Sequence, residues 1–195
     1  MPAPCNLILA SSSPRRQALL KELGLPFEIC AADSDGPVVS SLPGERVAGH
    51  ALFKAQQIAA QNPGCWVLSG DTLVYGASEF FEKPRDKSQA RRMLQRLEVI
   101  GEHRVYTACC LISPASEVFQ HVDSAKVAFQ AIPAGDLETY LNGDEWRDKA
   151  GSYAIQGWAA QYASCAAEDF ETIVGMSKVT VKKLFVESGF QYPVE

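Results

Sequence analysis

The start of the chain most constrains its fold, because a short buried strand runs directly into a polar turn and a helix. The apolar, partly β-branched run from Cys5 to Ala10 predicts the strand. Three serines follow, and Pro14 suits the first turn of a helix over Arg15–Leu23, which Gly24 ends. A strand, a turn and a helix in this order are typical of an α/β protein.

The same turn is a candidate anion site. The N-terminus of a helix offers unpaired backbone N–H groups and the positive end of the helix dipole. Ser11 lies in the turn, and Arg15 and Arg16 add fork-shaped donors that match phosphate oxygens. Taken alone, the segment is equally well explained as a capped helix whose arginines point into solvent.

The rest of the chain predicts a mixed α/β sheet flanked by helices. Further strands are expected over 27–32, 66–68, 72–75, 103–112 and 118–129, the last two as a β-ribbon. Further helices are expected over 45–60, 86–97, 134–141 and 179–188. With 195 residues and no repeat or linker, the chain is expected to form one domain over 1–195, made of two lobes that share a core and leave a cleft.

Composition excludes several classes of function. The net charge of −5 argues against a protein that binds nucleic acid, since phosphate contacts dominate that affinity, and favours a small anion in a local basic pocket. The six cysteines form no Cys-x-x-Cys pair and the three histidines have no ligand spacing to them, so no zinc site is expected. Without a secretory start or an apolar run of about 20 residues, a cytoplasmic protein with reduced thiols is expected.

Asp71 is a candidate functional carboxylate. The segment Ser69–Thr72 follows the apolar run Trp66–Leu68, and ligands of α/β proteins bind beyond the carboxyl ends of strands. An aspartate there could hold Mg²⁺ or orient a water molecule. The alternative is a turn in which the aspartate side chain bonds nearby backbone amides.

Two later segments carry weaker signals. Lys83 lies in a charged turn before the helix at 86–97, and the segment Asp148–Gly157 combines a lysine, small residues and the amide of Gln156. Glycines allow a ligand to approach the backbone, and a glutamine amide can pair with the edge of a base. By itself, the segment of Lys83 is better explained as a solvated charge cluster. The alternative for Asp148–Gly157 is a loop, a strand and a loop in which Gln156 is a polar surface residue.

Taken in order, these segments resemble the Maf family of nucleotide pyrophosphatases. The resemblance runs from about Leu7 to the last helix, so agreement by chance is not expected. The matching blocks are Leu7–Arg16, Lys54–Ala55, Gly70–Val74, Glu82–Pro84 and Asp148–Gly157.

The resemblance implies a fold like that of inosine triphosphatases and a reaction. Water would attack the α-phosphate of dTTP or UTP, with Mg²⁺ or Mn²⁺ as cofactor, and release the monophosphate and pyrophosphate. Asp71 would be the essential carboxylate, which the family uses as the proton acceptor. Because an aspartate with an ordinary pKa of about 3.9 is a weak base, a role for Asp71 as a metal ligand that orients a metal-bound water is favoured, and the sequence leaves the proton acceptor open. The residues that it implies for the triphosphate are Ser11, Arg15, Arg16, Lys54 and Lys83. Arg15, Thr72 and Gln156 match the trio associated with the dTTP/UTP branch.

One departure from the family concerns its acidic pair after the second strand. Gly36 stands where the family has a glutamate, so Asp35 is expected to serve as the metal ligand from one position earlier, with Asp33 a weaker candidate. Gly36→Glu is expected to leave activity unchanged or to raise it. A regulatory protein that binds nucleotide without efficient hydrolysis is the alternative, and the sequence leaves open a homodimer and the choice between standard and modified pyrimidine triphosphates.

Overall fold

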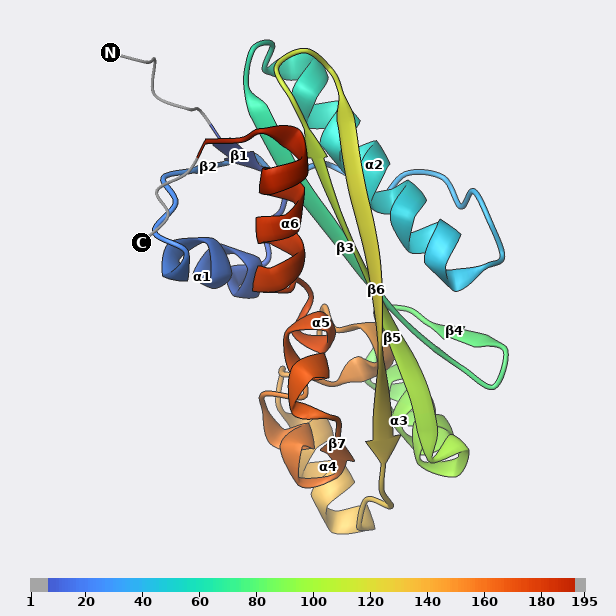
Figure 1. Ribbon diagram of the computed structural model, residues 1–195. Helices are drawn as coiled ribbons and strands as arrows, with labels where there is room; N and C mark the ends of the chain where they lie inside the picture. The colour runs from blue at the N-terminus through green and yellow to red at the C-terminus, as the bar shows by residue number, and fades with distance from the viewer. Residues whose placement is uncertain (1–6, 192–195) are drawn as a thin grey trace. The chain divides into compact units, whose positions relative to one another are not determined.

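The computed structural model describes residues 7–191 and has the mixed α/β architecture that the sequence predicts (Figure 1). The strands are β1 (Leu7–Leu9), β2 (Glu28–Ile29), β3 (Trp66–Gly76), β4 (Glu79–Phe81), β5 (Glu102–Ile112), β6 (Val118–Phe129) and β7 (Ala163–Ser164). The α-helices are α1 (Pro14–Glu22), α2 (Pro43–Gln61), α3 (Lys87–Ile100), α4 (Ala134–Asn142), α5 (Phe170–Val174) and α6 (Lys178–Ser188). Three short 3₁₀ turns, at Ala150–Ser152, Trp158–Gln161 and Ala167–Asp169, complete the list.

The strands form one sheet with both parallel and antiparallel neighbours. Its order is β2-β1-β3-β5-β6-β7, and β4 pairs with β3 outside this path. β1 is parallel to both β2 and β3, whereas β3–β4 and β6–β7 are antiparallel. The prediction of a mixed sheet is therefore confirmed, as is the ribbon of β5 and β6, which the turn 113–117 joins.

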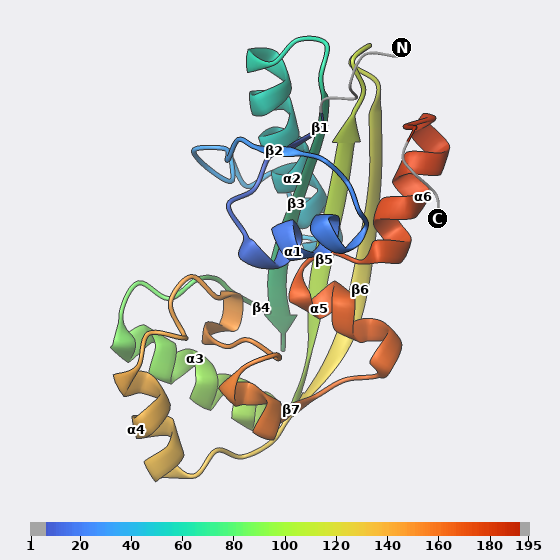
Figure 2. The ribbon, with the colours of Figure 1, turned by 90° about the vertical axis from the view of Figure 1, so that its left-hand side faces the viewer.

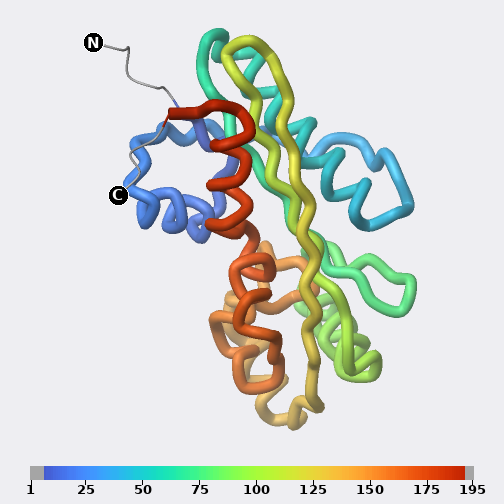
Figure 3. The backbone as a smooth tube through the Cα atoms, viewed as in Figure 1, coloured from blue at the N-terminus to red at the C-terminus, as the bar shows by residue number. Residues whose placement is uncertain are grey.

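The chain divides into two compact units. The first comprises residues 1–71, 107–123 and 175–195, and the second comprises 72–106 and 124–174. The chain therefore passes from one unit to the other four times, and three of these passages lie inside β3, β5 and β6 (Figure 3). Asp71 is the last residue of the first unit before the chain enters the second.

In the first unit, helices cover both faces of the sheet. α1 and α6 lie on one face and α2 lies on the other (Figures 1 and 2). Leu9 and Leu68, which are neighbours in the parallel pair β1–β3, belong to a buried cluster with Leu20 of α1 and Leu184 of α6. Because side chains alternate across a strand, the residues next to Leu9 in β1 and next to Leu68 in β3 point to the opposite face of the sheet, where α2 lies.

The second unit has its own core. Leu94 of α3, Leu137 of α4, Val105 of β5 and Val127 of β6 share one buried cluster. The backbone N–H of Gly151 donates to the carbonyl oxygen of Glu82 at 3.3 Å, which ties the segment around residue 151 to the turn after β4. Two of the segments singled out in the sequence, those of Lys83 and Gln156, are therefore joined within this unit.

One prediction about the strands is wrong. The sequence suggested two short strands separated by Gly70 and Asp71, whereas β3 runs without a break from Trp66 to Gly76. Residues 66–68 pair with β1 and residues 74–76 pair with β4, so different partners support the two halves of β3. Asp71 thus lies within a strand and not in a turn beyond its end.

No helix in residues 7–191 is long and apolar enough to cross a membrane. Five described cysteines, Cys30, Cys65, Cys109, Cys110 and Cys165, are free thiols. The cytoplasmic location that the sequence suggested stays a prediction, as does the homodimer.

Candidate functional site

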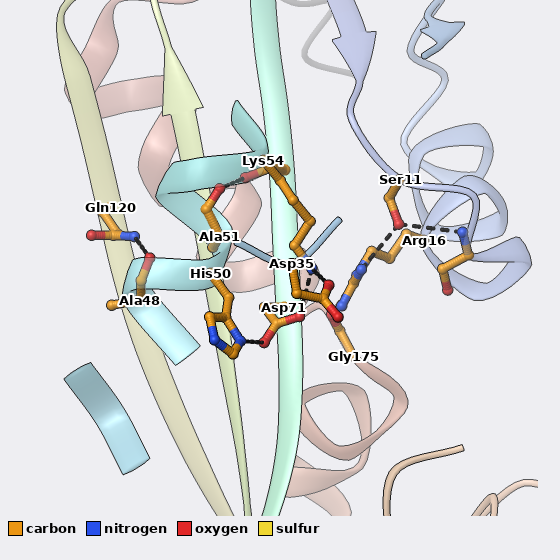
Figure 4. A network of polar contacts seen from close by, with 12 residues as sticks. Ser11, Arg16, Asp35, Ala48, His50, Ala51, Lys54, Asp71, Gln120 and Gly175 are labelled. Atoms are coloured by element: carbon orange, nitrogen blue, oxygen red, sulfur yellow. Dashed lines mark hydrogen bonds and ion pairs between the residues drawn. The ribbon is translucent and has the colours of Figure 1, made fainter. Parts of the chain in front are cut away.

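Asp71 points toward α2 because of its register in β3. Ser69, two residues earlier on the same face, donates from Oγ to the carbonyl oxygen of Ala51 in α2 at 2.6 Å. Gly70 lies on the opposite face, where an added Cβ would be 3.0 Å from Arg16 Nε and 3.2 Å from Met176 Cε. Figure 4 shows the Asp71 carboxylate directed at side chains of α2.

Two donors from α2 hold the Asp71 carboxylate. Lys54 Nζ donates to Oδ1 at 2.6 Å, and His50 Nδ1 lies 3.2 Å from Oδ2 (Figure 4). The side chains of Lys54, His50 and Asp71 are only 10%, 11% and 13% exposed. Burial by itself raises the pKa of Asp71, but the hydrogen bond from His50 and the charges of Lys54 and Arg16 outweigh it and lower that pKa below its ordinary value. Asp71 is therefore ionised near neutral pH.

Asp35 reaches the same lysine. Its Oδ1 accepts from Lys54 Nζ at 2.7 Å, so the ammonium group bridges two carboxylates, one buried and one half exposed. Asp33 Oδ2 instead accepts from Gln57 Nε2 at 3.2 Å. The sequence ranked Asp35 above Asp33 as a partner for Asp71, and of the two it is Asp35 that shares Lys54 with Asp71.

Arg16 joins the first turn of α1 to this site. Its Nη1 donates to Ser11 Oγ at 3.0 Å, and its Nε donates to the carbonyl oxygen of Gly175 at 3.0 Å (Figure 4). Burial lowers the pKa of Arg16, while the charge of Asp71 acts in the opposite direction. Arg15 is half-buried, and burial together with the neighbouring Arg16 lowers its pKa.

The hydroxyl of Ser11, and not that of the N-cap residue of α1, makes the hydrogen bonds that shape this turn. Ser13 is the N-cap residue of α1, but its side chain makes no capping hydrogen bond. Ser11 Oγ accepts from the backbone N–H of Ser13 at 3.2 Å as well as from Arg16. The hydroxyl of Ser11 therefore fixes both the turn and the guanidinium group.

The remaining candidate residues belong to the second unit. Thr72 follows Asp71 in β3 and is partly buried, whereas Lys83 and Gln156 are exposed. The contacts around Asp71 described above are all made within the first unit. They bring together Ser11, Arg16, Asp35, Lys54 and Asp71 from four separate stretches of sequence.

Two carboxylates of the site suit a divalent cation. No group of three or more His, Cys, Asp or Glu side chains within residues 7–191 is placed to hold a metal. Asp35 and Asp71 nevertheless converge on one cation, the Lys54 ammonium group. Carboxylate oxygens are ligands that divalent cations such as Mg²⁺ bind. Asp35 and Asp71 are therefore the residues of this unit that would hold such an ion.

There is no room for a side chain at the position of Gly36. Its φ is +80°, and a Cβ added there would lie 2.4 Å from Cγ of Phe53, a residue of α2. Both the backbone conformation and the Phe53 ring oppose a side chain here, so the structure argues against the expectation that Gly36→Glu leaves activity unchanged or raises it. In this chain an aromatic ring lies where the side chain of residue 36 would begin.

His50 is the residue of this site that the sequence reasoning missed. It was considered only as a zinc ligand and rejected for its spacing. A second signal was available, because His50 and Lys54 are four residues apart in a predicted helix and so share one face. The spacing alone does not indicate a site, because only the tertiary structure shows that β3 places a carboxylate opposite these two side chains.

Comparison with known proteins agrees with this architecture. A dTTP/UTP pyrophosphatase of Rhodospirillum rubrum is 37% identical over 187 residues, which cover 95% of this chain and 89% of that protein. One of Anaeromyxobacter dehalogenans is 38% identical over 193 residues and covers 97% of each. The structure of the Staphylococcus aureus Ham1 protein matches in fold alone, with a TM-score of 0.55 and 11% identity over 94% of this chain and 99% of that one.

The family described as Maf-like protein matches residues 6–188, which include every candidate site residue named above. The ordered sequence blocks, the mixed sheet and this match over nearly the whole length agree, and the chain belongs to the Maf-like protein family.

Proposed function

We propose that the protein is a nucleoside triphosphate pyrophosphatase that hydrolyses dTTP or UTP, with water, to the monophosphate and pyrophosphate. The observation that carries the proposal is the buried, ionised Asp71 carboxylate, which Lys54 and His50 hold close to the buried Arg16. The relatives that match nearly the whole chain are named dTTP/UTP pyrophosphatase, which supports the substrate class.

The charges of the first unit support binding of a triphosphate. A nucleoside triphosphate carries about four negative charges near neutral pH, and fixed cations lower the energy of such an anion in a site with little water. Arg15 at the start of α1 and Lys54 on α2 are the candidate partners for its phosphates, and Ser11 adds a hydroxyl. Arg16 orients Ser11 while it contributes its charge.

Asp71 is proposed to hold the metal ion and to orient the attacking water. A carboxylate whose pKa lies below its ordinary value is a poor proton acceptor, so a role as metal ligand suits Asp71 better than a role as general base. A Mg²⁺ or Mn²⁺ ion held by Asp71 and Asp35 would lower the pKa of a bound water and offset charge on the phosphates. Lys54 would then bind the phosphates as well as the carboxylates, because the phosphates would compete with both carboxylates for its ammonium group.

Preference for a pyrimidine base is assigned to three residues by their resemblance to the dTTP/UTP branch. Arg15, Thr72 and Gln156 match that branch at each position. Gln156 is exposed, and Thr72 is partly buried and follows Asp71 directly in β3. Lys83, also exposed, is the proposed phosphate ligand of the second unit.

A second candidate function is a regulatory protein that binds nucleotide without turning it over. Gly36 is the observation that favours it, because the structure excludes a third carboxylate from this position by placing Phe53 there. The two candidates differ in one respect only, namely whether bound nucleotide is hydrolysed.

The test is pyrophosphate release from a panel of nucleoside triphosphates in the presence of Mg²⁺ or Mn²⁺, with Asp71→Asn as the blank. Release that favours dTTP or UTP and is at least about 1,000-fold lower in Asp71→Asn would support the pyrophosphatase. Circular dichroism of the variant checks that it is folded. Nucleotide binding by calorimetry without any release would support the regulatory protein instead, and a wild-type rate in Asp71→Asn would remove Asp71 from the mechanism.

A further inference from the structure

His50 contacts the carboxylate on which the proposed reaction depends, and the proposal gives it no role in turnover beyond that contact. Its Nδ1 lies 3.2 Å from Asp71 Oδ2, and its side chain is only 11% exposed (Figure 4). An ionised carboxylate has acceptor atoms only, so Nδ1 must carry the proton and donate it to Oδ2. The contact therefore requires an N–H at Nδ1.

The other ring nitrogen agrees with this assignment. Nε2 of His50 is buried and has no hydrogen-bond partner among the described residues. A proton on Nε2 alone would have no acceptor and would leave the Nδ1 lone pair facing the carboxylate oxygen of Asp71. The surroundings of the ring therefore favour an N–H at Nδ1, which donates to Asp71.

His50 and Lys54 act on Asp71 as a pair because of the helix period. They are four residues apart on α2 and therefore lie on one face of the helix, which faces β3. Lys54 takes Oδ1 and His50 takes Oδ2, so each oxygen of the carboxylate has its own donor. A single donor would leave the carboxylate free to rotate about its Cβ–Cγ bond, while two donors on one rigid helix fix its plane.

The two donors of Asp71 differ in what else they contact. Lys54 is shared with Asp35, and in the proposed reaction it would also bind the phosphates. Within residues 7–191, Asp71 is the polar partner of His50, whose other ring nitrogen has none. The hydrogen bond from His50 is therefore the undivided one.

We propose that His50 is a positioning residue, which holds the plane of the Asp71 carboxylate through its Nδ1–H while Lys54 turns toward the substrate phosphates. The inference rests on the proposed role of Asp71 as the metal-binding carboxylate. It predicts that loss of the His50 donor slows turnover of bound nucleotide and leaves nucleotide affinity nearly intact, since the proposed phosphate ligands are other residues.

The kinetic test compares three variants in the pyrophosphate-release assay. His50→Leu removes the donor, and His50→Asn keeps an N–H donor close to the place of Nδ1. Gln120→Leu is the matched control, because Gln120 Nε2 donates to the carbonyl oxygen of Ala48 in the same helix at 2.7 Å without touching Asp71 (Figure 4). Each variant is checked by circular dichroism, and kcat and KM are measured separately.

We expect His50→Leu to lower kcat by about tenfold and to change KM by less than about twofold, consistent with the loss of one hydrogen bond to a charged group. His50→Asn should recover most of the loss, and Gln120→Leu should keep the wild-type kcat. An equal loss of kcat in His50→Leu and Gln120→Leu, or no recovery in His50→Asn, would overturn the positioning role and leave a packing role.

A thermal-unfolding cycle tests the contact without any activity. His50→Leu is made in the wild type and in Asp71→Leu, which removes both carboxylate oxygens. The drop in Tm caused by His50→Leu should be at least halved in the Asp71→Leu background if the two side chains are coupled. If His50 and Asp71 are coupled but the wild-type protein releases no pyrophosphate, the proposed function is refuted and the contact is supported. Equal drops in Tm in both backgrounds would refute the contact itself.

Discussion

Lys54 and Asp71 form a buried ion pair, with Nζ 2.6 Å from Oδ1, and the same ammonium group lies 2.7 Å from Asp35 Oδ1. The pair joins α2 to the middle of β3 and so links the two elements that carry the site. The Lys54 ammonium group lies between two carboxylates, where a metal ion would bind the carboxylates and a triphosphate would bind the lysine. The strength of this ion pair and of the contacts around it can be tested by mutation.

The first prediction concerns Lys54. Lys54→Met should reduce turnover by at least about 100-fold and destabilise the fold by about 2 kcal/mol, because it leaves the buried Asp71 carboxylate with fewer donors. Urea unfolding measures the stability. Asp35→Asn is the control, since Asp35 is half exposed and its ion pair should be worth less than about 1 kcal/mol. Equal destabilisation by the two variants would show that burial of Asp71 does not set the strength of this pair.

The second prediction concerns Arg16. Arg16→Lys should cost about 2 kcal/mol of stability, because one ammonium group cannot reach both Ser11 Oγ and the Gly175 carbonyl oxygen as the guanidinium does. Arg15→Lys, one residue earlier and half-buried, should cost less. Guanidinium chloride unfolding of the two variants provides the comparison, and a larger loss in Arg15→Lys would contradict the role assigned to the buried guanidinium.

The third prediction concerns Gly36. Gly36→Glu should destabilise the protein by about 2 kcal/mol and should not raise activity, since the new Cβ would overlap the Phe53 ring. Alanine substitutions separate the two causes. Gly24 also has a positive φ, of +67°, but an added Cβ would meet nothing within 4 Å, so Gly24→Ala measures the backbone strain alone.

Gly36→Ala should therefore cost more than Gly24→Ala, and Phe53→Ala should reduce that difference. Thermal unfolding of the four variants, including the double variant, gives the comparison. The steric explanation fails if Gly36→Ala and Gly24→Ala cost the same, or if removal of the ring brings no relief.

The fourth prediction concerns the pH dependence of stability. Burial lowers the pKa of His103 to about 4 from an ordinary value of 6.5, so the unfolded chain takes up a proton at His103 more readily than the folded protein does. The stability from the neutral ring is present above pH 6.5 and is lost as the pH falls toward 4. Between pH 7 and pH 5 the expected loss is about 2 kcal/mol.

His103→Gln should flatten this part of the stability curve, as measured by urea unfolding at a series of pH values. His103 Nε2 lies 2.6 Å from the Tyr153 hydroxyl, so the variant is also expected to be less stable at pH 7, and only the slope is diagnostic. An unchanged slope in His103→Gln would assign the pH dependence to other groups.

Local patterns in the sequence were sufficient for most of the elements. The serine–proline start of α1, and Pro43 before and Asn62–Gly64 after the predicted α2, identified these helices to within two residues, because start and stop signals are encoded in neighbouring residues. The long alternating runs gave β5 and β6 for the same reason. The short elements between residues 150 and 174 were not predicted, since they have no period of their own.

The candidate residues of the first unit were also visible in the sequence, but only as separate blocks. Ser11, Arg16 and Asp71 were identified by residue type and by resemblance to the Maf family, and Lys54 by the resemblance alone. Gly70 and Asp71 were placed in a break between strands, because glycine and aspartate are poor strand formers and local propensity was the only guide. The pairing of β3 with β1 and β4 overrode that propensity.

Sequence by itself determined the fold class, the family and the identity of the charged residues, because each depends on residue types and on their order along the chain. Tertiary structure alone decided that Asp71 faces α2, that His50 joins Lys54 on its carboxylate, and that Phe53 closes the position of Gly36. The physical reason is that these relations depend on the register of β3 against one face of α2. Register is fixed by packing between segments that are far apart in the chain.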